Sequence, residues 1–241
     1  MIDFHSHILP GMDDGAKTLD DSLELLRMTE QQRISGIVAT PHFYPDKEEP
    51  DVFLERRRKA MHDLYKALTP SMPEVYVGAE VAYFGGMGRS EQMRRLTVKG
   101  THTILVEMPF SPWSEQVLKD MRGLSDNLGL LPVIAHIERY MAYQNREMLY
   151  RLTDLGVRIQ SNADFFTRFL TRRRAVTMLA RNEIQFIGSD CHNTSSRPQT
   201  LGKALETIEE RLGSDMIDYI TETTELQLNG AIPLRKMFET E

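Results

Sequence analysis

The sequence predicts an α/β protein with a mainly parallel sheet, either closed into a barrel or doubly wound. Short runs rich in valine and isoleucine alternate with longer amphipathic runs along the 241 residues. This alternation is typical of parallel strands joined by helical crossovers. No linker, low-complexity tract or repeat interrupts it, so residues 1–241 are expected to form a single domain.

The expected strands are apolar runs that are too short to be stable helices. Each is bounded by turn residues or by a charged segment. In chain order they are Ile2–His5, Gly36–Thr40, Glu74–Val81, Thr103–Glu107, Leu131–Ala135, Val157–Ser161 and Gln185–Gly188.

The longer runs between these strands carry apolar residues on one face and are expected to be helices. Thr18 is placed to cap the first of them, in which Leu19, Leu23 and Leu26 share a face. The run Gly85–Gly88 lacks the spacing of a phosphate-binding loop and is expected to be a flexible loop. The later helices are expected at Pro50–Ala67, Glu115–Leu128, Arg146–Leu155, Phe165–Arg181, Leu201–Leu212 and Asp215–Thr223.

The composition excludes several classes of function. A net charge of −6 argues against nucleic-acid binding through a basic surface. The single cysteine forms no internal disulfide and fits a reducing compartment. Asp3, His5 and His7 interrupt the first apolar run, unlike in a signal peptide, and no run approaches the roughly 20 apolar residues of a membrane span. The protein is therefore expected in the cytoplasm.

Residue types that bind metals follow six of the seven expected strands. Because the carboxyl ends of parallel strands form one face of a barrel or open sheet, these side chains are expected to meet there. A lone His or Glu after a strand is usually an ordinary loop residue, but six such coincidences are improbable. In strand order the residues are His5 and His7, His42, Glu80, Glu107, His136, and Asp190 with His192. The remaining histidines, His62 and His102, are expected at the surface.

These residues, together with Asp14 from the loop after the first strand, offer only nitrogen and oxygen ligands. One metal ion takes about four to six ligands, so this many imply two or three divalent ions and a bridging carboxylate. Zinc, manganese and iron(II) all suit such donors, and the residue types do not choose between them. Close metal pairs are typical of enzymes that hydrolyse phosphate esters.

The motifs around these residues resemble those of the PHP (polymerase and histidinol phosphatase) superfamily. Within it the chain is similar to the bacterial protein-tyrosine phosphatases that regulate capsule and exopolysaccharide synthesis. The resemblance runs in order from Met1 to about Arg197, and the Pro-Gly-x-Asp-Asp-Gly-Ala loop is its most specific part. The motifs are His5–His7, Pro10–Ala16, Thr40–His42, Ala79–Glu80, His136–Arg139 and Ser189–Asn193.

The resemblance implies a distorted (β/α)7 barrel, a PHP or TIM-like fold, with a trinuclear metal site at the carboxyl ends of the strands. Manganese is the favoured ion, and iron or zinc are the alternatives. Cys191 departs from the family, in which a small residue such as alanine is more common. The ligand sets that the resemblance implies are His5, His7, Glu80 and Asp190 for one ion, Glu80, Glu107 and His136 for the second, and Asp14, His42 and His192 for the third.

The implied activity is hydrolysis of phosphotyrosine in proteins by a metal-activated hydroxide. The implied substrate is a bacterial tyrosine kinase with a tyrosine-rich tail that controls capsule synthesis. Arg139 and Arg197 lie in loops after candidate ligands and are expected to hold the charge of the transition state. Arg172–Arg174 lie within an expected helix and are expected to form a solvated face.

Three alternatives remain open on the sequence. The same metals would serve a small-molecule phosphatase of the histidinol-phosphate type or a phosphodiesterase, and the chain could be a non-catalytic metal-bound module. Cys191 and Arg197 also have the Cys-x5-Arg spacing of cysteine-dependent tyrosine phosphatases. That stretch has no glycine to let the backbone close around phosphate, and the middle residue of an extended Asp-x-His would point away from the metals. The spacing is therefore interpreted as coincidence.

Overall fold

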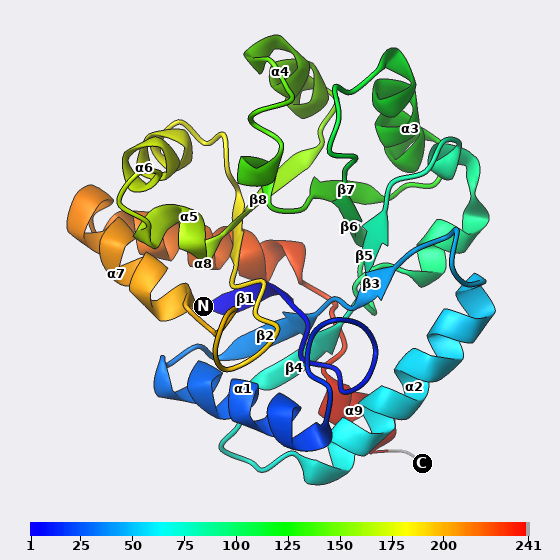
Figure 1. Cartoon of the computed structure of the whole chain (residues 1–241), viewed down its shortest axis with the longest axis vertical. Helices are drawn as coiled ribbons and strands as arrows, with labels where there is room; N and C mark the ends of the chain where they lie inside the picture. Colours follow the sequence, from blue (N-terminus) through cyan, green and yellow to red (C-terminus); the bar gives the residue numbers. More distant parts are fainter. Residues whose placement is uncertain (240–241) are drawn as a thin grey trace.

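The computed structural model describes residues 1–239, and in that range all strand pairings are parallel (Figure 1). One sheet has the order β1-β2-β4 and the other the order β3-β5-β6-β7-β8-β9. The strands are β1 (Ile2–Ser6), β2 (Gly36–Ala39), β3 (His42–Phe43), β4 (Glu74–Val77), β5 (Glu80–Ala82), β6 (Thr103–Glu107), β7 (Leu131–Ile134), β8 (Arg158–Asn162) and β9 (Phe186–Gly188). The expected single domain of residues 1–241 extends two residues beyond the described range.

Hydrogen bonds join the two sheets into a barrel. The segment β2–β3 is one strand broken at Pro41, and β4–β5 is one strand broken at Gly78; the backbone N–H of Gly78 donates to Ala39 O (2.9 Å) across the break. At the other seam, Asp190 N donates to His5 O (2.8 Å) beside β9. The segments therefore occupy seven positions in chain order, which confirms the distorted (β/α)7 barrel and not a doubly wound sheet.

The helices lie around the outside of the barrel (Figure 1). Thr18 forms the expected cap of the first helix, because its hydroxyl accepts a hydrogen bond from Asp21 N (3.2 Å) while the Asp21 carboxylate accepts from Thr18 N (2.9 Å). The α-helices are α1 (Leu19–Gln31), α2 (Pro50–Ala67), α3 (Glu115–Asp126), α4 (Arg146–Asp154), α5 (Ala163–Thr167), α6 (Arg172–Ala180), α7 (Leu201–Leu212), α8 (Ser214–Gln227) and α9 (Leu234–Phe238), with 3₁₀ turns η1 (Met87–Arg89), η2 (Glu91–Arg95) and η3 (Ile137–Arg139).

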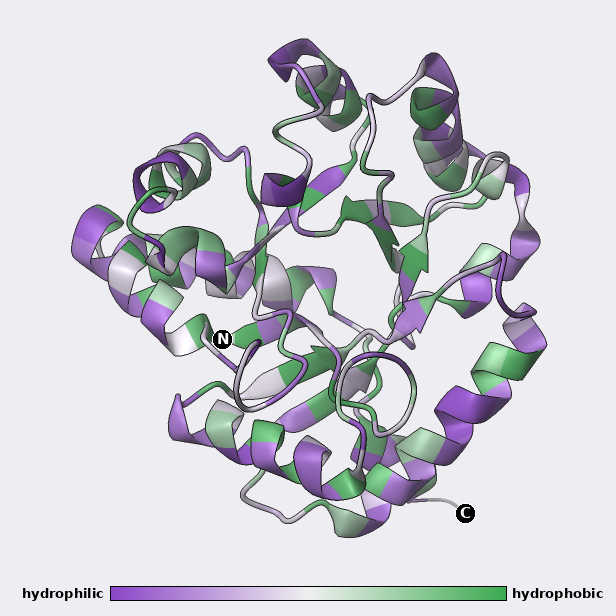
Figure 2. Ribbon diagram, viewed as in Figure 1, coloured by the Kyte–Doolittle hydropathy of each residue, from purple (hydrophilic) through white to green (hydrophobic). Residues whose placement is uncertain are grey.

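The strands are largely hydrophobic, whereas the outer helices alternate hydrophobic and hydrophilic residues (Figure 2). One core cluster combines side chains from several barrel strands, among them Phe4 and Phe186, whose rings stack at 4.3 Å. The register between β1 and β2 shifts between Asp3 and Ser6, just where His5 follows Phe4. Successive side chains of a strand point to opposite faces, so a core phenylalanine and a site histidine can be neighbours in the chain.

The predicted helix Phe165–Arg181 is wrong, because the chain forms α5 and α6 with a turn between them. The Thr171 hydroxyl donates to Phe165 O (2.8 Å), which occupies a carbonyl that a continuous helix would use. Phe169 and Leu170 in the turn are 85% and 91% exposed, so no core contact favours a helical path there.

The predicted flexible loop Gly85–Gly88 is also wrong at its end. Gly88 packs closely on α3. A Cβ at Gly88 would lie 2.4 Å from Asp120 O, and one at Gly123 would lie 2.8 Å from Gly88 O. The short helix α9 was not predicted. No helix among residues 1–239 is long and apolar enough to cross a membrane.

Candidate metal centre

All nine residues predicted as metal ligands lie close together on one face of the barrel. Most lie at or just after the carboxyl end of a strand, whereas His42 and Glu80 begin the short segments β3 and β5, and Asp14 lies in the loop after β1. Their ligand atoms fall into overlapping groups within which every atom is within 4.8 Å of the others. The groups are His5, His7 and Asp190; His42, Glu80 and Glu107; and His7, Asp14, His42 and His192, while His136 approaches Glu80. Relative to the implied ligand sets, the geometry gives His7 and His42 a place in two groups each.

The most buried part of the centre is formed by His5, His7, Glu80 and Asp190. The Nε2 atoms of His5 and His7 are 3.1 Å apart, and Glu80 Oε2 lies 3.2 and 3.3 Å from them. Asp190 Oδ1 lies 3.7 and 3.4 Å from the same two nitrogens. Since all four atoms can donate electron pairs and point to one small region, the arrangement is typical of a metal site.

Glu80 links this group to the next. Its Oε1 lies 2.7 Å from His136 Nε2, and its Oε2 lies 3.1 Å from His42 Nδ1. Glu107 approaches both rings at 3.8 to 3.9 Å. The two oxygens of Glu80 thus face different neighbours, as expected for a bridging carboxylate.

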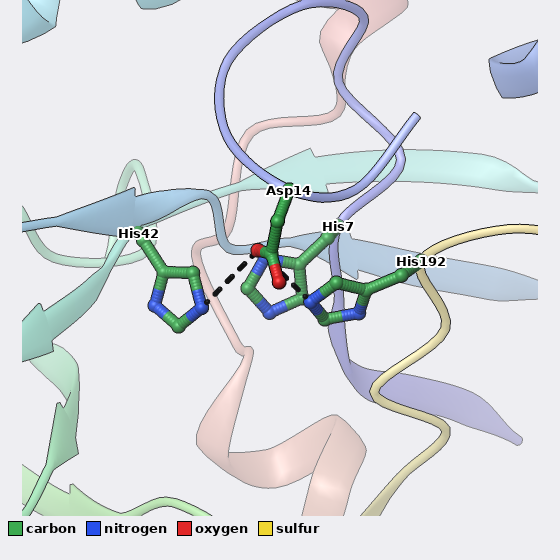
Figure 3. A group of neighbouring side chains, drawn as sticks. All are labelled: His7, Asp14, His42 and His192. Atoms are coloured by element: carbon green, nitrogen blue, oxygen red, sulfur yellow. Dashed lines mark ion pairs between the residues drawn. The ribbon is translucent and has the colours of Figure 1, made fainter. Parts of the chain in front are cut away.

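Asp14 covers the third group from the solvent side, and Figure 3 shows it between His42 and His192. Its Oδ1 lies 3.2 Å from His192 Nε2 and 3.6 Å from His42 Nε2. The His7 ring lies behind them, with its centroid 3.9 Å from that of His192 and 4.5 Å from that of His42. The Asp14 side chain is 62% exposed, so this group is the one nearest to solvent.

Hydrogen bonds at the far side of three rings fix their orientation. His7 Nδ1 donates to Asp13 Oδ2 (2.8 Å), and His5 Nδ1 lies 3.3 Å from Gln160 Oε1. His192 Nδ1 lies 2.9 Å from the backbone oxygen of Asp190. Because each Nδ1 faces an acceptor and carries the proton, each Nε2 directs its lone pair at the centre.

Asp13 and Gln160 were not predicted as site residues. Asp13 Oδ2 also accepts from His42 N (2.8 Å), and Gln160 Oε1 accepts from His136 N (2.7 Å), so each residue holds two parts of the site. Nothing in the sequence distinguishes Asp13 from its neighbour Asp14. Asn162 was missed as well, although it directly follows the expected strand Val157–Ser161 and the strand-end argument would have found it.

The two predicted arginines both reach the centre through Asp190. Oδ2 of Asp190 accepts from Arg139, from Arg197 (2.6 Å) and from Asn162 Nδ2 (2.7 Å). Arg197 also lies 3.6 Å from Asp14 Oδ2. The other oxygen of Asp190 points at His5 and His7 and makes no hydrogen bond with any group of residues 1–239. Asp190 therefore separates a cluster of ligands from a cluster of cations.

Several ligand atoms of the centre are buried and have no hydrogen-bond partner in residues 1–239, which suits the binding of divalent cations. His42 Nδ1, His136 Nδ1, Asp190 Oδ1 and His192 Nε2 are buried without a hydrogen-bond partner among the described residues. Buried polar atoms are rarely left in this way unless they serve a ligand. The fit of divalent ions to this centre therefore rests on these donors.

The close packing of these residues shifts their pKa values. Burial and the neighbouring charge of Glu80 raise the pKa of Glu107 to about 7. Burial, with the nearby His7 ring, lowers the pKa of His192 to about 3, so its ring is neutral and its Nε2 can coordinate. Burial alone would lower the pKa of His7, but the facing Asp13 carboxylate holds this pKa well above its ordinary value. Because divalent cations bind ionised carboxylates and neutral imidazoles, ions at this centre would displace protons from Glu107 and His7.

Cys191 does not belong to the centre. Its side chain is fully buried in the hydrophobic core, whereas the residues before and after it, Asp190 and His192, are candidate ligands. Burial raises the pKa of the thiol far above its ordinary value. A thiolate nucleophile at this position is therefore unfavourable, as the sequence interpretation expected.

Comparison with known proteins gives consistent results. The model of the family described as "Capsular polysaccharide synthesis, CpsB/CapC" matches residues 1–227. The chain is 34% identical to the tyrosine-protein phosphatase YwqE of Bacillus subtilis over 98% of this chain and 94% of YwqE. It is 30% identical to the tyrosine-protein phosphatase CpsB of Streptococcus agalactiae, over 89% of this chain and 92% of CpsB.

A solved structure has the same fold. It is one of the crystal structures of YwqE from B. subtilis and CpsB from Streptococcus pneumoniae, which are described as unique metal-dependent tyrosine phosphatases. The TM-score is 0.83 at 30% sequence identity, and the match covers 96% of both chains. The resemblance to the capsule-regulating phosphatases and the barrel fold expected from the sequence are thereby confirmed.

Proposed function

Because the chain belongs to the CpsB/CapC family of capsular polysaccharide synthesis, we propose that it is a metal-dependent protein-tyrosine phosphatase. The observation that carries this proposal is the convergence of His5 Nε2, His7 Nε2, Glu80 Oε2 and Asp190 Oδ1 on one buried region. The relatives at 30 to 34% identity carry the same activity in their names.

The nine residues at the strand ends would hold two or three divalent ions. Bound ions of this kind supply a nucleophile from water at neutral pH and offset phosphate charge. The protein groups alone are strongly acidic here: Asp13, Asp14, Glu80, Glu107 and Asp190 surround the centre. A phosphotyrosine dianion would be repelled by this cluster, and bound ions would offset the carboxylate charge beside Arg139 and Arg197.

Arg139 and Arg197 would orient the phosphate. Their side chains are 33% and 34% exposed beside Asp190, and each guanidinium has donors beyond the one that Asp190 occupies. The tyrosine leaving group has a pKa near 10, so it departs without the strong general acid that a serine phosphate would need. Holding the transferred phosphoryl group is therefore the main task of these arginines.

The proposal extends to the partner, the ion and the compartment. Membership in a capsule-synthesis family supports a bacterial tyrosine kinase with a tyrosine-rich tail as the substrate. Manganese is the proposed ion because the resemblance to the capsule-regulating phosphatases favours it; the nitrogen and oxygen ligands suit iron and zinc as well. The single cysteine supports a place in the cytoplasm.

A comparison of substrates on one metal-loaded sample tests the proposed activity. A phosphotyrosyl peptide should be hydrolysed with a kcat/KM at least about tenfold above that for histidinol phosphate, because the open centre accepts a phenolate leaving group on a chain. A phosphodiester should be the poorest substrate. A higher kcat/KM for histidinol phosphate would assign the chain to the small-molecule class instead, and no hydrolysis with Mn, Fe, Co or Zn would support a non-catalytic module.

Cys191→Ala separates the metal mechanism from the cysteine mechanism. The variant should keep phosphatase activity within about twofold, because the thiol is buried away from the ligands, while losing about 1 kcal/mol of unfolding free energy from the small cavity. Chelation by EDTA should abolish the activity of both proteins, with recovery on adding manganese. Loss of activity in the variant together with resistance to EDTA would reverse this assignment.

A further inference from the structure

A cavity of about 670 Å³ opens beside the candidate metal centre and extends beyond it. Arg139, Asp190 and Arg197 form the part that belongs to the centre. The lining continues to Arg168, which precedes α6, and to Arg174, which lies in α6. Neither arginine takes part in the centre. The volume lies in the usual range of ligand sites, about 300–1,000 Å³, and exceeds the need of a phosphate group alone.

The outer part of this cavity has more arginines than exposed carboxylates, since Arg168 and Arg174 lie there with Asp164. The Arg174 side chain forms no hydrogen bond or ion pair with any group in residues 1–239, and Arg168 pairs only with Asp164 of its own helical turn (2.7 Å). Glu138, a buried carboxylate in the cavity wall, accepts hydrogen bonds from Ser161 Oγ (3.1 Å) and Asn162 N (3.2 Å). The outer cavity therefore offers guanidinium donors to an incoming anion.

The turn between α5 and α6 adds an exposed apolar edge to the same place. Leu170 is 91% exposed and lines both this cavity and a neighbouring one of about 570 Å³. Arg174 is likewise shared by the two cavities, and Arg173 extends the basic lining into the second. An apolar edge beside unpaired arginines suits an extended peptide that carries acidic side chains.

We propose that this outer cavity binds the substrate segment next to the phosphotyrosine, and that Arg168 and Arg174 select substrates with aspartate or glutamate there. The inference rests on the proposed phosphatase function and deepens it. A phosphotyrosine held at Arg139 and Arg197 is part of a chain, and that chain would leave the centre along the cavity. Acidic residues in the segment would then lie opposite the guanidiniums.

Two phosphotyrosyl peptides of equal length test this selection. One carries aspartate and glutamate on both sides of the phosphotyrosine, and the other carries asparagine and glutamine at the same positions. The metal-loaded wild type should show a higher kcat/KM for the acidic peptide, mainly through a lower KM, with about a two- to fivefold gain for each ion pair formed. The gain should shrink between 50 mM and 500 mM NaCl, because exposed ion pairs are screened by salt.

The variants Arg168→Gln and Arg174→Gln should each remove part of this preference, and together nearly all of it. The matched control is Arg181→Gln, since Arg181 is an exposed arginine at the end of α6 that lines neither cavity. Free phosphotyrosine should be hydrolysed equally by the wild type, the two single variants, the double variant and the control. Equal kcat/KM for both peptides in the wild type, or an unchanged preference in the double variant, would overturn the inference; failure to hydrolyse free phosphotyrosine would instead overturn the proposed function.

Discussion

Replacing His7 by alanine is expected to lower kcat/KM for a phosphotyrosyl peptide by at least about 10³-fold, or about 4 kcal/mol of transition-state stabilisation. His7 belongs to two of the three groups of ligand atoms, and its ring lies between those of His42 and His192. Its removal leaves Asp13 Oδ2 without the ring nitrogen that it accepts from. Both groups should therefore lose affinity for their ions at once.

Metal content after dialysis, measured beside activity, checks this expectation. His7→Ala should retain at least one ion fewer per chain than the wild type, while its far-UV circular dichroism stays unchanged. His102→Ala is the matched control, because His102 is an exposed histidine remote from the centre. A His7→Ala protein with full metal content and wild-type turnover would contradict the assignment of His7 as a ligand.

Gly15→Ala is expected to reduce activity by at least about 10²-fold, although residue 15 bears no functional side chain. A Cβ at Gly15 would lie 2.2 Å from His7 O and 2.4 Å from His7 Cβ, so the Pro10–Ala16 loop or β1 must move. The same loop carries Asp13, which orients His7, and Asp14, which covers the third group. Overpacking of this kind also costs about 1–3 kcal/mol of unfolding free energy.

Thermal unfolding and steady-state kinetics separate the two effects. Gly15→Ala should have a lower Tm and a large loss of kcat even at temperatures at which it is fully folded. The control is Gly85→Ala, because no atom lies within 4 Å of a Cβ at that position. Equal kinetics for Gly15→Ala and the wild type would mean that the loop can move away without displacing His7.

Local patterns predicted the regular elements well. The helices Pro50–Ala67 and Leu201–Leu212 and the strand Thr103–Glu107 have the predicted bounds. The prediction failed for Phe165–Arg181, in which the apolar residues Phe169 and Leu170 face solvent. Periodicity marks which residues could share a face, but it carries no information on whether a core lies opposite that face.

The candidate site was predictable because its ligands follow strands. In a parallel barrel every strand ends at the same face, so a residue such as His136 or Glu107 meets His5 although more than 100 positions separate them in the chain. The family resemblance added the grouping of these residues. The supporting residues Asp13 and Gln160 were not found, because an aspartate in a loop and a glutamine in a strand have no distinctive pattern.

The sequence by itself therefore predicted a parallel α/β sheet, the face that carries the centre and the nine candidate ligands, and the family resemblance added the barrel. Only the tertiary structure decided how they share their atoms: Asp190 turns one oxygen to His5 and His7 and the other to Arg139 and Arg197. Such choices depend on contacts between distant segments, on the bulge in β1 and on side-chain packing. Neither the hydrophobic periodicity nor the spacing of motifs predicts these contacts, since both describe only residues that are close in the chain.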